Sequence, residues 1–133
     1  MENVKMQPVL TKEDYRIIMD NLNGGMDKHR CSRQEAEALV GELKRAKLVP
    51  TSKIDPNVVR LNSFVSICNR NENKIIELVL VTPDKADIKQ RKISVLSPMG
   101  AALIGYAKGE TISWVLPAGI KTFTIVDVRN NMP

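Results

Sequence analysis

The side chains best suited to metal or acid–base chemistry lie in a loop between two predicted helices: Met26, Asp27, Lys28, His29 and Arg30, followed by Cys31. His29 and Cys31 supply at most two metal ligands, whereas a structural zinc site needs four. Asp27 is the one carboxylate of this loop, and the cations of Lys28 and Arg30 would repel Mg²⁺ from it. We therefore predict no metal site and no cofactor, and we interpret His29 as a solvated loop residue.

A second candidate site is the start of a short predicted helix, about Pro98 to Tyr106, formed by Ser97, Pro98, Met99 and Gly100. Ser97 can act as an N-cap, and proline suits the first turn, where its missing N–H costs nothing. The unpaired N–H groups of such a turn can also donate hydrogen bonds to an acidic or carbonyl group of a partner. The alternative is that Ser97 is only a cap and Pro98 only a helix starter.

The first of the two helices that position the loop begins near Thr11. Thr11 followed by Asp14 is typical of a helix start, and apolar residues then repeat at helical spacing as far as Leu22. The sequence Asn23-Gly24-Gly25 should stop this helix, because asparagine and glycine readily take the left-handed conformation.

The second helix begins at a capping box formed by Ser32 and Glu35 and runs to about Lys47, before Pro50. Two amphipathic helices joined by a short loop should bury their apolar stripes against each other. We therefore expect residues 1–49 to form a short antiparallel helical hairpin, that is, a short coiled coil.

The rest of the chain reads mostly as strands. Residues 50–57 form a predicted linker with two prolines, and residues 58–133 contain short apolar stretches at strand spacing. Ile75–Thr82 is almost continuously apolar, as is typical of a central strand, and Cys68 is expected in the core. The predicted fold class is α+β: the helical hairpin over 1–49, then an antiparallel β domain with one short helix.

Composition narrows the classes of function. The net charge is +5, but aromatic residues make up only 4%, which disfavours a stacking surface for nucleic acid. No apolar stretch approaches the ~20 residues that cross a bilayer. The N-terminal residues lack a secretory signal. These features predict a cytoplasmic protein with no membrane partner and with reduced cysteines; the oligomeric state stays open.

The order of elements in residues 93–128 resembles the C-terminal domain of the GreA/GreB transcription factors. The resemblance rests on Ser-Pro-Met-Gly-Ala-Ala-Leu at 97–103, on the stop at Gly109 and on Leu-Pro-Ala-Gly at 116–119. Residues 55–65 also look like the entry to the first strands of the short-armed Rnk type within this family. The resemblance implies a C-terminal domain with an FKBP-like fold.

The same resemblance implies a partner. Family members bind RNA polymerase: the C-terminal domain docks on a coiled coil of the largest subunit at the rim of the secondary channel, and the helical hairpin inserts toward the active site. On this basis Ser97, Pro98, Met99 and Gly100 would face polymerase, and nucleic acid would be met only through polymerase.

The chain departs from the transcript-cleavage members of the family in two ways. Their hairpin tip uses acidic residues to hold a catalytic magnesium, whereas the tip here offers only Asp27. Its second helix would span roughly 24 Å at ~1.5 Å per residue, which is much shorter than a cleavage-factor arm. We therefore expect a non-enzymatic regulator that binds polymerase without transcript cleavage. The alternatives are an FKBP-like prolyl isomerase or chaperone, and a stand-alone nucleic-acid-binding module.

Overall fold

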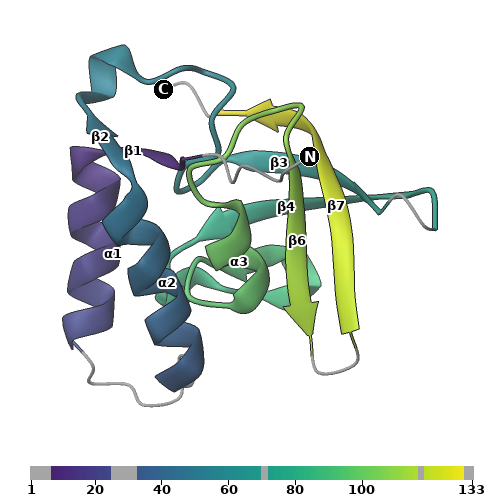
Figure 1. Cartoon of the computed structure of the whole chain (residues 1–133), viewed down its shortest axis with the longest axis horizontal. Helices are drawn as coiled ribbons and strands as arrows, with labels where there is room; N and C mark the ends of the chain where they lie inside the picture. The colour runs from purple at the N-terminus through teal and green to yellow at the C-terminus, as the bar shows by residue number, and fades with distance from the viewer. Residues whose placement is uncertain (1–6, 25–32, 70–71, 117–118, 131–133) are drawn as a thin grey trace.

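The computed structural model describes residues 7–24, 33–69, 72–116 and 119–130 (Figure 1). The N-terminal part contains β1 (Val9–Thr11), α1 (Lys12–Gly24), α2 (Arg33–Arg45), β2 (Lys47–Val49) and the 3₁₀ helix η1 (Thr51–Lys53). The C-terminal part begins with β3 (Phe64–Asn69), β4 (Lys74–Val81), η2 (Pro83–Lys85), η3 (Ile88–Gln90) and β5 (Lys92–Ser94). It ends with α3 (Pro98–Leu103), β6 (Thr111–Leu116) and β7 (Gly119–Arg129).

The fold class is α+β, as predicted, with a five-stranded sheet in the order β5-β4-β3-β7-β6. Neighbouring strands run antiparallel except β4 and β5, which are parallel. A parallel pair needs a long crossover, and η2 and η3 occupy that connection. The predicted antiparallel sheet is present, and this edge adds one parallel pair that the sequence analysis did not predict. The likeness to FKBP stays a prediction.

One face of the sheet is buried and the other is open to solvent. In β3 the alternation is clean: Val65 and Ile67 are buried, while Ser66 is only half-buried. In β7 the register shifts opposite Ser66 and Ile67. This irregularity returns Val128 to the buried face, although Ile125 and Val128 are three residues apart.

The start of α1 and the end of α2 are tied together by a short parallel sheet that the sequence did not reveal. In β1 and β2, Val9 pairs with Lys47 and Thr11 with Val49. α2 consequently ends at Arg45 rather than near Lys47. The predicted start of α1 is confirmed, because the backbone N–H of Asp14 donates to Thr11 Oγ1 at 3.0 Å.

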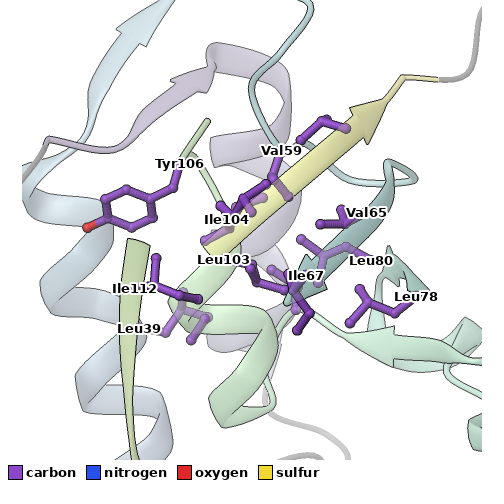
Figure 2. Close-up of a cluster of buried hydrophobic side chains, with 14 of the residues drawn as sticks. Leu39, Val59, Val65, Ile67, Leu78, Leu80, Leu103, Ile104, Tyr106 and Ile112 are labelled. Carbon is purple, nitrogen blue, oxygen red and sulfur yellow. The ribbon is translucent and has the colours of Figure 1, made fainter. Parts of the chain in front are cut away.

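The helices and the sheet share one hydrophobic core. Ile18 of α1 and Leu39 of α2 are fully buried in the same cluster as Ile67 and Leu103 of the C-terminal part. Figure 2 shows Leu39, Leu103 and neighbouring side chains gathered in this cluster. In Figure 1, α3 lies between α2 and β6, and it contacts both. The predicted division into a hairpin over 1–49, a linker over 50–57 and a domain over 58–133 stays a prediction, as does the antiparallel hairpin itself.

The strand predicted over Ile75–Thr82 is present as β4 and lies between β5 and β3, as expected for a central strand, but its first half is exposed. One prediction about burial was wrong. Cys68 is a free, half-buried cysteine on the solvent-facing side of β3 rather than a core residue.

Candidate functional site

The short helix α3 begins as the sequence predicts. Gly100 N–H donates to Ser97 Oγ at 3.1 Å, and the Ser97 hydroxyl in turn donates to the carbonyl of Ser94 at 2.7 Å. Pro98 occupies the first turn and its side chain is exposed. The Ser97 hydroxyl therefore both accepts and donates a hydrogen bond within the chain. Pro98 is the most accessible residue of this site.

The two residues that follow Pro98 turn toward the interior. Met99 is half-buried and packs against the core. Gly100 is buried, and a Cβ placed there would lie 2.8 Å from Val95 Cα. Gly100 was predicted to face a partner. Instead it is buried against the backbone of Ser94 and Val95, at the end of β5, and this corrects the prediction.

The helix ends at Leu103, earlier than predicted, because the chain turns at Gly105. Gly105 has a φ of +87°, and a Cβ at this residue would lie 2.7 Å from Pro8 Cβ. The carbonyl of Gly105 accepts a hydrogen bond from Val9 N–H at 2.9 Å. Glycine is therefore favoured here both by the positive φ and by the close approach, which joins the end of α3 to the strand that leads into α1.

The loop considered for metal or acid–base chemistry falls outside the described residues. This applies to Met26, Asp27, Lys28, His29 and Arg30, and also to Cys31 and the capping serine Ser32. Within the described part, no three His, Cys, Asp or Glu side chains form a group that could hold a metal ion. Nor does that part contain a helix long and apolar enough to cross a membrane.

A buried aspartate joins α1 to the segment before β3, a contact that the sequence analysis missed. Asp14 Oδ2 accepts a hydrogen bond from Leu61 N–H at 3.2 Å and lies 3.6 Å from Arg60 Nε, as an ion pair. Burial raises the pKa of the Asp14 carboxyl, while the Leu61 N–H and the Arg60 guanidinium oppose this effect. The only sequence signal was a carboxylate on the apolar side of a helix.

A second polar contact joins α2 to the residues that follow α3. The Tyr106 hydroxyl donates to Glu42 Oε1 at 2.8 Å, and Arg45 Nη1 lies 2.9 Å from the same oxygen. Arg45 Nη1 is also 3.4 Å from the Tyr106 oxygen. The tyrosine itself is 6% exposed. Sequence spacing gives no sign of this cluster, because 64 residues separate Tyr106 from Glu42.

Two surface clefts flank these elements. One cleft of about 410 Å³ follows the outer side of α2 and is lined by Ala36, Glu37, Val40, Gly41 and Lys44. The other, of about 480 Å³, opens beside the Asp14–Arg60 pair and is mostly polar, with Asn62, Asp84 and Lys85 in its wall. Because both charge signs line the second cleft, its chemistry favours neither an anion nor a cation.

Comparison with known proteins gives a consistent result. Residues 54–130 match the family model described as "Transcription elongation factor, GreA/GreB, C-term". This match begins before β3 and includes α3 and the whole five-stranded sheet. It therefore contains Pro98 and Tyr106 but neither α1 nor α2.

Individual relatives extend the similarity. A "Transcription elongation factor GreA" of Pelobacter propionicus is 36% identical over 126 residues, which is 93% of this chain and 80% of that protein. The "Regulator of nucleoside diphosphate kinase" of Escherichia coli is 37% identical over 87 residues, 65% of this chain; the match spans 64% of the relative, just under two thirds of its length.

A solved structure shows similarity across the helices as well. The "Prokaryotic transcription elongation factor GreA/GreB from Nitrosomonas europaea" superposes with a TM-score of 0.75 at 31% identity, over 95% of this chain and 100% of that one. The resemblance that the motif at 97–103 predicts is therefore confirmed in sequence and in fold.

Proposed function

Because this chain belongs to the GreA/GreB family of transcription factors, we propose that it is a regulator that binds RNA polymerase at the secondary channel and does not promote transcript cleavage. The observation that carries the proposal is the family match over residues 54–130, which contains α3 and its exposed Pro98. Transcription regulation follows from the family; the docking position and the lack of cleavage are our proposal.

The docking surface that we propose is the exposed start of α3. Pro98 would meet the coiled coil of the largest polymerase subunit, with the exposed part of Met99 beside it. Ser97 supports this surface by capping the helix, and Gly100 supports it from behind as a packing residue. Contact with nucleic acid would then occur only through polymerase.

The size of the helices supports binding without cleavage. α1 and α2 contain 13 residues each, which corresponds to roughly 20 Å of helix at ~1.5 Å per residue. A short arm would place its tip far from the polymerase active site. Asp27, the single carboxylate of the predicted tip, lies between basic neighbours in sequence and would be a poor magnesium ligand.

The described aromatic residues offer no support for the two alternative functions. Tyr106 and Phe123 are buried in the core, and Phe64 lies on the open face under the Arg129 guanidinium, 5.8 Å from its ring centre. Neither of the clefts described above is lined by an aromatic residue. An aromatic isomerase pocket and a stacking surface for nucleic acid are therefore both unsupported within the described residues.

The test is binding to purified core RNA polymerase, with GreB as competitor. A Pro98→Asp variant should fold, because the side chain is exposed and aspartate suits a helix N-terminus. We expect it to lose binding at least tenfold, about 1.4 kcal/mol. The matched control is Pro56→Asp, which changes an exposed proline in the segment before β3 and should bind like the wild type.

The outcomes separate the parts of the proposal. Wild-type binding that GreB displaces and that Pro98→Asp loses would support docking through α3. Equal binding by both variants would contradict that surface, and no binding by the wild type at micromolar concentrations would contradict the polymerase partner. Cleavage of backtracked RNA by the wild type would overturn the non-enzymatic part.

A further inference from the structure

We propose that Tyr106, Glu42 and Arg45 form a positioning cluster that fixes the direction of the helical arm, defined as α1 and α2, relative to the docking helix α3. The orientation itself is a property of this chain alone. Its consequence, that docking at α3 presents the arm in one direction, rests on the proposed function.

Tyr106 is held rigidly on the C-terminal side of this contact. Its N–H donates to the carbonyl of Leu103 at 3.1 Å, and its carbonyl accepts from Val59 N–H at 2.8 Å. The neighbouring Gly105 N–H donates to the carbonyl of Val59 at 3.0 Å. The ring therefore leaves a fixed backbone directly after α3, with its hydroxyl directed at α2 (Figure 2).

Glu42 and Arg45 supply the contact on the arm side. They are three residues apart on α2, so they share one face of the helix. The Glu42 carboxylate receives both the Tyr106 hydroxyl at 2.8 Å and the Arg45 guanidinium at 2.9 Å. A hydrogen bond weakens steeply as its angle departs from the preferred geometry. The cluster is thus suited to fix both the distance and the rotation of α2.

The apolar contacts in the same interface are not directional. Leu39 and Leu43 of α2 are buried in the shared core, and burial of this kind is favourable over a range of relative rotations. The polar cluster lies at the end of α2 next to β2, where the arm joins the rest of the chain. A small rotation there would displace the far end of a 13-residue helix by much more.

The experiment measures the arm's direction with two spin labels. With both native cysteines changed to serine, labels are placed at Glu37→Cys, in the half of α2 away from the cluster, and at Ser113→Cys on β6; both native residues are exposed. Pulsed electron paramagnetic resonance then gives the distribution of distances between them. We expect one narrow distribution for the parent, and a shifted or several-fold broader one for Tyr106→Phe and for Glu42→Ala.

Control variants separate positioning from stability. Glu42→Gln keeps an oxygen that accepts from the Tyr106 hydroxyl and should restore the narrow distribution. Tyr15→Phe removes a hydroxyl from a half-buried tyrosine of α1 outside the cluster and should change nothing. Ile125→Val removes a methyl group from the core and lowers stability without touching the cluster. Its distance distribution should therefore stay narrow well below its melting temperature.

A parental distribution for both Tyr106→Phe and Glu42→Ala would overturn the proposal, as would equal broadening by Ile125→Val. A second measurement tests the consequence: Tyr106→Phe should bind polymerase several-fold less tightly than the wild type, because its arm is no longer held in the binding direction, and should displace GreB less well to the same extent. If the wild type does not bind polymerase, the proposed function fails while the distance result still decides the positioning role.

Discussion

Gly100 of α3 packs directly against the carbonyl oxygen of Ser94, with no room for a methyl group between them. A Cβ at Gly100 would overlap that oxygen and lie 2.8 Å from Val95 Cα, and both are backbone atoms that cannot rotate away. The closest approach of α3 to the end of β5 is thus set by one missing side chain. The neighbouring turn places Pro98 at the surface.

We expect Gly100→Ala to lower the free energy of unfolding by about 1–3 kcal/mol, the usual cost of inserting atoms into a packed site. Urea denaturation would measure the loss. The variant should also weaken polymerase binding, because α3 must shift to make room. A stability equal to that of the wild type would show that the backbone around Ser94 yields more easily than the packing indicates.

Gly41→Ala is the matched substitution with the opposite expected sign. Gly41 lies in the middle of α2 and is exposed, and no described residue beyond its own helical turn has an atom within 4 Å of where a Cβ would lie. Alanine there should raise the free energy of unfolding by about 0.5–1 kcal/mol, because glycine loses more conformational freedom in a helix. If Gly41→Ala were less stable than the wild type, the added methyl group would have to clash with atoms that occupy the cleft on α2 in solution.

The sequence predicted elements wherever local pattern and burial agree. The alternation in β3, the Thr11 start of α1 and the Ser97 cap of α3 are all local features, and all three are present. The buried extent of β4 was not predictable in this way. Ile76 pairs with the fully buried Ile67 yet is 39% exposed, so its exposure is set by the tertiary packing around this half of the strand rather than by local sequence.

The candidate site was predictable only in part. Pro98 at the start of α3 follows from the Ser-Pro motif, and its exposure agrees with a surface role. The inward position of Gly100 depends on the approach of Ser94, and the Tyr106–Glu42 contact depends on how α2 packs. Tertiary contacts of this kind leave no spacing pattern in the sequence.

The stability of the chain should depend on pH through Asp14. Burial raises its pKa above the ordinary value of 3.8 in the folded state, so the folded chain binds this proton more tightly than the unfolded chain. The stability that the protonated Asp14 carboxyl adds is fully present below pH 3.8. It is lost as the pH rises through the higher pKa that this carboxyl has in the folded state. Asp14→Asn should therefore gain stability relative to the wild type across that window.

Denaturation at a series of pH values would test this expectation. Asp20→Asn changes an exposed aspartate of the same helix and corrects for the loss of one negative charge from α1. A difference between the wild type and Asp14→Asn that is constant with pH would contradict the prediction. A loss of stability at every pH would show that the Arg60 pair outweighs burial.

Tyr106 should titrate well above an ordinary tyrosine. Burial raises its pKa from 10.0 to about 12, with the nearby Arg45 opposing the shift and the Glu42 carboxylate adding to it. Stability from the neutral phenol is present below 10.0 and is lost as the pH rises through about 12. In a Tyr15→Phe background Tyr106 is the chain's only tyrosine, so ultraviolet absorbance reports it alone. Glu42→Gln in this background should lower the pKa of Tyr106, since a carboxylate that repels the phenolate is removed. If Tyr106 of the Tyr15→Phe protein titrated at the ordinary tyrosine value, its ring would not be held against α2.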